Sequence, residues 1–136
     1  MARGRARTIA SVFATALSLS VLALPAAAED ASAENGADVF KKCRACHQIG
    51  PQAHSLVGPE LNGIIGRKAA AVQGFPYSDA AKKAGAGGLV WTEEALFKYL
   101  ENPQSVMKGT KMSFAGLKDP QDRKDVIAYL KKFSTK

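Results

Sequence analysis

Hydrophobic residues are distributed in two ways along the chain: one long unbroken run near the N-terminus, then short groups at helical spacing between stretches rich in Gly and Pro. The run covers residues 9–24, contains no acidic residue, is preceded by three arginines and is followed by the alanines at 26–28. A basic start, an apolar middle and small residues at a cleavage site are typical of a secretory signal peptide. We therefore expect cleavage after Ala28 to remove residues 1–28, and residues 29–136 to form a single domain.

Two other interpretations of this leader stay open. A run of this length could nearly span a bilayer as an uncleaved anchor, and arginine-rich leaders without acidic residues also occur in mitochondrial transit peptides. The run is continuously apolar instead of amphipathic, and its Ala, Ser and Thr content is weak for a permanent membrane span. The pattern therefore favours cleavage and export.

Four short segments beyond the leader carry helix signals. Asn35 can cap a helix that begins near Gly36, and Ser78 with Asp79 can open a second helix that stops by Gly85. The glycine-rich corner that follows is expected to be flexible. Between these two helices, Gly and Pro recur so often that the chain should run in ordered loops.

The third and fourth helices have clearer boundaries. Thr92 is a good N-cap with two acidic residues behind it, and Asn102-Pro103 ends that helix. A loop should follow until Asp119, which caps the last helix with Pro120 at its first position. The fold class is therefore all-α with long loops. Helices so few and short leave the centre to be filled by something other than their side chains.

Composition adds a modest basic charge. The chain has 136 residues, 46% of them hydrophobic, and a net charge of +7 that falls to +4 when the three leader arginines are removed. Such a charge can steer association with an acidic partner. The lysines are scattered in ones and twos, so nucleic-acid binding is not expected.

The two cysteines of the chain lie in one motif, Cys43-Arg44-Ala45-Cys46-His47. This C-x-x-C-H spacing is associated with c-type haem attachment, in which two thiols bind the vinyl groups of one porphyrin and the histidine ligates the iron. A disulfide, a thioredoxin-like redox pair and half of a zinc site are the alternatives. They fit less well, because the β-α-β context and the further ligands are missing and a disulfide leaves the histidine unexplained.

The second axial position has three candidates in the mature chain: Met107, Met112 and His54. A methionine opposite histidine raises the reduction potential of haem iron, whereas a second histidine gives a lower one. Composition and spacing do not choose among the three.

The order of motifs resembles class I cytochrome c, of the bacterial c-two type close to the mitochondrial protein. The pieces that carry the resemblance are Cys43 to His47, residues 57–63, 66–68, 75–80, 91–94, 99–103 and 109–118. The resemblance implies the cytochrome c fold, a few short helices with long ordered loops wrapped around one covalently bound haem c. It also implies that Met112 is the sixth ligand and that Met107 has no assigned role.

The same resemblance implies roles around the haem. The Pro59 carbonyl would accept the free ring N–H of His47, which fixes the tautomer. Tyr99 and Thr110 would form hydrogen bonds near the Met112 side of the haem. The propionates would be held by Arg67, Tyr77 and Trp91, and Phe114 would cover the haem face beside Met112. Three departures from the family pattern stand out, Lys108 for a proline, Ala81 for an asparagine and a longer glycine-rich corner before Trp91.

A haem with both axial positions filled is suited to passing single electrons, so we expect an electron carrier and not an enzyme. The resemblance places Lys42, Lys111 and Lys118 in a docking ring for an acidic face. It implies a monomer that carries electrons from a cytochrome bc-type complex to a terminal oxidase or a photosynthetic reaction centre. The export signal indicates the periplasm. A small haem peroxidase, a ligand-binding sensor and a haem-free thiol or metal protein are the competing functions.

Overall fold

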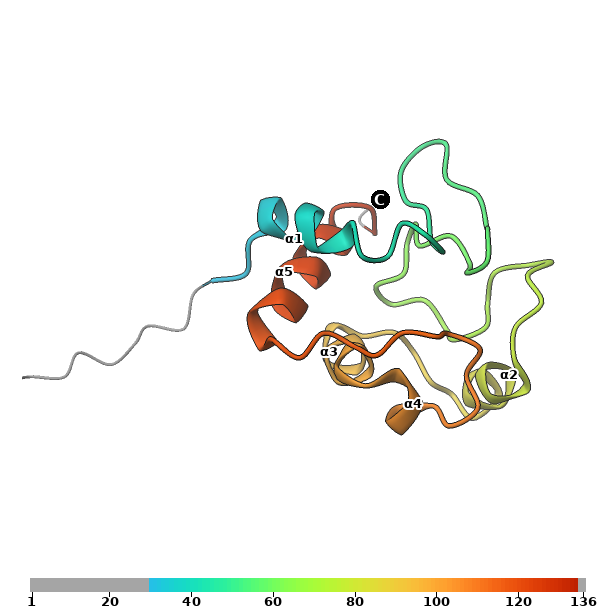
Figure 1. Ribbon diagram of the computed structural model, residues 1–136. Coiled ribbons are helices and arrows are strands. Elements are labelled where there is room, and N and C mark those ends of the chain that lie inside the picture. The colour runs from blue at the N-terminus through green and yellow to red at the C-terminus, as the bar shows by residue number, and fades with distance from the viewer. Residues whose placement is uncertain (1–29, 135–136) are drawn as a thin grey trace, which may run out of the picture.

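The computed structural model describes residues 30–134, which fold into five helices joined by long loops (Figure 1). The helices are α1 Ala33–Phe40, α2 Asp79–Ala86, α3 Glu93–Glu101, α4 Pro103–Val106 and α5 Pro120–Lys131. The only β pairing in this range is an isolated bridge between Lys68 and Val90. The all-α prediction is therefore confirmed for the described part of the chain. No helix within 30–134 is both long and apolar enough to cross a bilayer. The leader prediction concerns residues outside this range.

Helix α1 begins earlier than predicted. Its N-cap is Ser32, whose hydroxyl accepts a hydrogen bond from the Asn35 backbone N–H, so the predicted cap is itself the third residue of the helix. Both residue types cap helices well, and a distant contact selects between them. The Ser32 N–H donates to the Asp125 carboxylate on α5 at 2.7 Å, which fixes Ser32 in the extended conformation of a cap.

The predicted starts of α2, α3 and α5 are confirmed, because Ser78, Thr92 and Asp119 each accept a backbone N–H of the first turn. The loop predicted after α3 is wrong in part. Asn102 ends α3 and at the same time caps the short helix α4, where Pro103 occupies the first turn. A residue before proline leaves the helical region, which stops one helix and can open the next.

The glycine-rich corner is not simply flexible. Gly85 is a buried residue inside α2, where an added Cβ would collide with the carbonyl oxygen of Ala69. The missing side chain therefore permits close packing of α2 on the loop before it. Gly88, with a φ of +92°, carries the turn that follows.

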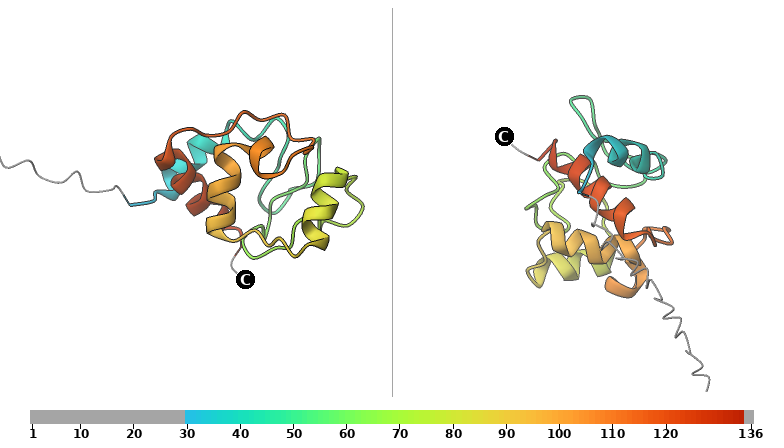
Figure 2. Two further views of the ribbon diagram at one scale, coloured as in Figure 1. Left: turned by 90° about the horizontal axis from the view of Figure 1, so that it is seen from below. Right: turned by 90° about the vertical axis from the view of Figure 1, so that its left-hand side faces the viewer.

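Helices α1 and α5 lie side by side and pack with α3 at one side of the molecule, while α2 lies at the opposite side (Figures 1 and 2). The core joins apolar residues of these three helices to Ile64 and Leu117 from the loops. Phe40 of α1 and Val126 of α5 are among its most deeply buried side chains, at 2% and 1% exposure. Long loops complete the other walls of the interior, as the small helical content requires.

Candidate haem site

The Cys-x-x-Cys-His motif begins three residues after the end of α1 and continues in helical turns. The Cys43 N–H donates to Phe40 O at 2.8 Å, and the N–H groups of Cys46 and His47 both donate to Cys43 O, at 3.0 and 2.9 Å. These turns place the two half-buried thiols and the imidazole on one wall of a cavity.

The cavity has a volume of about 550 Å³ and is lined mainly by apolar side chains. Every site residue that the resemblance implies lines it, with the exception of Lys118. The lining residues among those predictions are Lys42, Cys43, Cys46, His47, Pro59, Arg67, Tyr77, Trp91, Tyr99, Thr110, Lys111, Met112 and Phe114. Residues from all seven motifs thus meet around one space of the size that proteins use for cofactors.

His47 is held as a neutral, oriented imidazole. Its Nδ1 lies 2.7 Å from Pro59 O, and since a carbonyl only accepts, Nδ1 carries the proton and Nε2 keeps its lone pair. Burial lowers the pKa of His47, the hydrogen bond to Pro59 opposes this shift, and the charge of Arg67 adds to it. Gly58 leaves room for the ring, because a Cβ there would lie 2.7 Å from His47 Nδ1. A neutral imidazole with a free Nε2 is the form that binds a metal.

The electrostatics of Cys43 do not suit thiolate chemistry. Burial raises the pKa of the Cys43 thiol to about 11, against a smaller lowering by Lys42. Reactive cysteines of redox enzymes have lowered pKa values. The Cys43 thiol therefore does not resemble the activated thiol of a thioredoxin-type centre.

The three axial candidates are placed differently. His54 is exposed, does not line the cavity, and its Nδ1 lies 3.4 Å from Gln52 O. Met107 is buried and Met112 half-buried, and both line the cavity. The hydroxyl of Tyr99 donates to the sulfur of Met112 at 3.5 Å, which fixes the position of that sulfur.

Tyr99 belongs to a small polar network near Met112. Its hydroxyl also lies 3.3 Å from the Thr110 hydroxyl, and its ring packs on Trp91 with centroids 4.8 Å apart. Burial raises the pKa of Tyr99, so the phenol stays protonated and can donate. Tyr99 and Thr110 thus hydrogen-bond to each other and to Met112.

Arg67 has a partner that the sequence did not reveal. Its NH1 donates to the Glu60 carboxylate at 3.0 Å and to Asn62 O at 2.9 Å, and its NH2 donates to Glu60 O at 2.8 Å. Among residues 30–134, three of its five N–H donors find acceptors, which leaves two for another anion. Tyr77 accepts from the Val72 N–H at 3.2 Å and retains its own hydroxyl hydrogen.

The docking lysines are not equivalent. Lys42 forms an ion pair with Asp122 at 2.9 Å. Lys118 donates to Glu101 O at 2.7 Å and does not line the cavity. Lys111 is exposed beside the cavity and has no carboxylate partner within residues 30–134.

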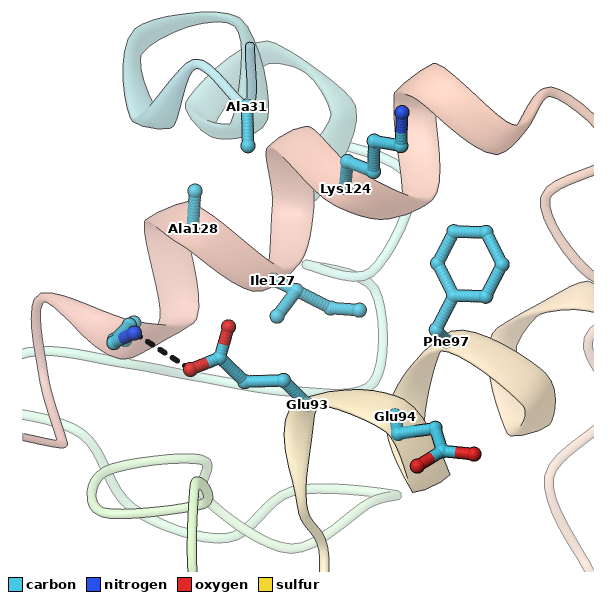
Figure 3. A pocket seen from close by; sticks show the side chains of 8 residues that line it. Ala31, Glu93, Glu94, Phe97, Lys124, Ile127 and Ala128 are labelled. Carbon is cyan, nitrogen blue, oxygen red and sulfur yellow. Dashed lines mark hydrogen bonds and ion pairs between the residues drawn. The ribbon is translucent and has the colours of Figure 1, made fainter.

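A second, smaller hollow of about 390 Å³ lies between α3 and α5 (Figure 3). An ion pair between Lys131 and Glu93, 2.6 Å long, lies along it, and Phe97 and Ile127 supply apolar walls. It is lined by none of the predicted site residues. The chemistry of the chain therefore gathers in the larger cavity.

The residues of the larger cavity fit a haem. Its apolar lining suits a porphyrin, two thiols and a neutral imidazole stand together on one wall, and a half-buried arginine with free donors suits a carboxylate.

Comparison with known proteins points in the same direction. The cytochrome c family model matches residues 33–134. Cytochrome c2 of Blastochloris viridis is 48% identical over 116 residues, which cover 85% of this chain and 87% of that protein. Cytochrome c2 of Rhodomicrobium vannielii is 57% identical over 95 residues, covering 70% and 74%. The structure of cytochrome c2 from Rhodospirillum centenum superposes with a TM-score of 0.74 at 44% identity, covering 76% of this chain and 99% of that one.

Three observations indicate the same family: the all-α fold with its central cavity, the motif Cys43 to His47 on the cavity wall, and these relatives. The chain belongs to the cytochrome c family and is an electron-transfer protein, not an enzyme, that carries one covalently attached haem c.

Proposed function

We propose that this chain is a periplasmic one-electron carrier in which Cys43 and Cys46 attach the haem and His47 and Met112 ligate its iron. The observation that carries the proposal is the meeting of these four residues at one cavity, although Met112 comes from a loop far along the chain from the other three. The Tyr99 hydrogen bond to the Met112 sulfur supports Met112 over Met107.

When bound, haem iron held by histidine and methionine supplies a reversible one-electron couple at high potential. The chain's own residues prepare the site for it. Pro59 holds the proton of His47 on Nδ1 and so presents Nε2. The Tyr99 hydroxyl donates to the sulfur of Met112, which also lines the cavity.

The propionate side of the proposal rests on Arg67, Tyr77 and Trp91. Within the described part of the chain Arg67 has two N–H donors without an acceptor, and Tyr77 keeps its hydroxyl hydrogen. Both can therefore donate to a carboxylate whose burial would otherwise be costly. Trp91 lines the same cavity. Phe114 also lines it, beside Met112 in sequence, and would exclude water from the haem face.

The axial ligand is tested by an optical redox titration of the haem-loaded protein, with Met112→Ala and Met107→Ala as matched variants. We expect the first to lower the midpoint potential strongly and to give a high-spin spectrum, because the iron loses a ligand. The second removes only buried apolar volume and should keep a low-spin spectrum. The reverse result would assign the iron ligand to Met107.

The proposed partners are a cytochrome bc-type complex as donor and a terminal oxidase or photosynthetic reaction centre as acceptor. Lys111 is exposed beside the cavity and has no carboxylate partner in the described range, so it is the best-placed docking charge. Lys42 and Lys118 contribute less because each already has a partner. The rate of electron transfer from a purified bc-type complex should fall with ionic strength. Lys111→Gln should reduce that dependence more than Lys131→Gln, which removes a lysine paired with Glu93.

The periplasmic location rests on the proposed leader, residues 1–28. Mass spectrometry of protein secreted by a bacterial host should show a mature chain that begins at Glu29. A retained leader in the membrane fraction would contradict cleavage and indicate an anchor. Gel filtration of the mature holoprotein should show a monomer.

A further inference from the structure

The loop that carries Met112 is held by few bonds of its own. Its flanks are fixed by backbone hydrogen bonds from Thr110 N–H to Met107 O, at 3.0 Å, and from Leu117 N–H to Leu100 O, at 2.7 Å. Between these flanks, residues 111–116 all lie in the described part of the chain and make no backbone-to-backbone hydrogen bond there. Side chains must therefore hold this stretch in place.

One exposed side chain reaches the loop backbone from α4. The amide nitrogen of Gln104 lies 3.2 Å from Thr110 O and 3.3 Å from Met112 O. An amide NH₂ group has two hydrogens, so it can donate one to each carbonyl. The Met112 backbone makes one other hydrogen bond, in which its N–H donates to the hydroxyl of Thr110 at 3.3 Å, within the same loop.

The base of Gln104 is firm. It follows Pro103, which is fully buried, and α4 is capped by Asn102, whose side chain accepts the Ser105 N–H. The hydrogen bonds from Gln104 therefore connect the loop to a helix that is anchored in the core.

We propose that Gln104 is a positioning residue that holds the backbone of Met112 so that its sulfur stays at the cavity. This inference rests on the proposed ligation of iron by Met112. Because Gln104 is exposed, its loss should cost the whole fold little, whereas local opening of residues 111–116 should become easier by the value of two hydrogen bonds.

Exogenous imidazole measures this opening directly in the haem-loaded ferric protein. Imidazole can bind the iron only when the sixth ligand has left, so its apparent affinity scales with the population of the opened loop. Loss of the weak red absorption that reports sulfur on ferric iron follows the titration. Global unfolding by guanidinium is measured on the same samples.

Two variants remove the bridge in different ways. Gln104→Leu lacks both donors, and Gln104→Glu keeps the length of the side chain but turns a carboxylate toward two carbonyl oxygens. The control is Ser105→Ala on the same helix, because the Ser105 hydroxyl donates to Asn102 O and does not touch the loop.

We expect both Gln104 variants to bind imidazole roughly five- to thirtyfold more tightly, the effect of two weak hydrogen bonds. The control and all unfolding midpoints should stay near the wild-type values. Unchanged imidazole affinity in both variants would overturn the inference, as would a matching loss of global stability. A wild-type protein without the sulfur band would instead overturn ligation by Met112 itself, and the inference with it.

Discussion

Replacement of Gly36 by alanine tests the helix crossing on which the haem-bearing motif depends. Gly36 is buried in α1 where this helix meets α5. A Cβ on Gly36 would overlap the backbone carbonyl of Asp125 and lie 2.8 Å from Cβ of Tyr129. Neither atom can rotate away, because one is backbone and the other is fixed to it. The two helices would have to move apart.

The size of the effect follows from two opposing contributions. Alanine is favoured over glycine inside a helix by about 1 kcal/mol. Overpacking against backbone typically costs about 1–3 kcal/mol and sometimes more. Separation of the helices also loosens the packing of Phe40 and Val126, whose full burial is worth about 1.5–3 kcal/mol each. We therefore expect a net destabilisation of about 1–3 kcal/mol.

Guanidinium unfolding of the haem-loaded protein, followed by far-ultraviolet circular dichroism, measures this difference. Gly87→Ala is the matched control, because Gly87 is exposed at the end of α2 and its nearest neighbour, Lys83 O, would lie 3.3 Å from the new Cβ. Its stability should change by less than about 0.5 kcal/mol. Equal stability of the two variants would refute the close approach of α1 to α5.

Three further substitutions test other contacts. Arg123→Met should lower the stability of the holoprotein in guanidinium by about 2–4 kcal/mol. The buried guanidinium of Arg123 donates to the backbone carbonyls of Leu117 and Lys118 and lies 4.4 Å from the centre of the Phe97 ring. An unchanged unfolding midpoint would show that these bonds are dispensable. Gly58→Ala should reduce the yield of haem-loaded protein, measured by absorbance per chain, since its Cβ would overlap the His47 ring; a normal yield would contradict this tight seat. Glu60→Gln should raise the midpoint potential in a redox titration, because it removes a negative charge beside Arg67. The increase should be smaller than the roughly 59 mV that corresponds to a tenfold change for one electron. A lower midpoint potential in the variant would contradict this reasoning.

Most helix boundaries could be predicted because their signals are local. Thr92 and Asp119 bond to N–H groups two or three residues away, so the sequence window contains the whole cap. The start of α1 could not be placed in this way. Ser32 and Asn35 are both good caps, and the carboxylate that favours Ser32 belongs to Asp125 at the other end of the chain.

The buried polar residues of α5 show a second limit of sequence patterns. Arg123 and Asp125 look like the solvent face of an amphipathic helix, yet both are buried, at 5% and 3% exposure. Their main partners include backbone groups of Leu117 and Ser32, and backbone groups have no signature in the sequence. The pairing of Glu60 with Arg67 could not be predicted for a related reason, because nothing in the sequence of its motif shows that the chain brings Arg67 back to Glu60.

The two walls of the haem cavity differ in how they are built, and this predicts the order in which they fail. The His47 wall is continuous with α1 through the turns that hold Cys43, and Pro59 and Gly58 fix the imidazole from the other side. The Met112 wall is a loop stretch, residues 111–116, that makes no backbone-to-backbone hydrogen bond within the described chain. Segments with few protected backbone bonds open at lower free energy than the parts around them. In a guanidinium titration of the holoprotein we therefore expect the sulfur band to disappear before the helical circular dichroism does. Coincident loss of both signals would mean that the loop is as stable as the helix pair, and that its side-chain contacts are stronger than their lengths suggest.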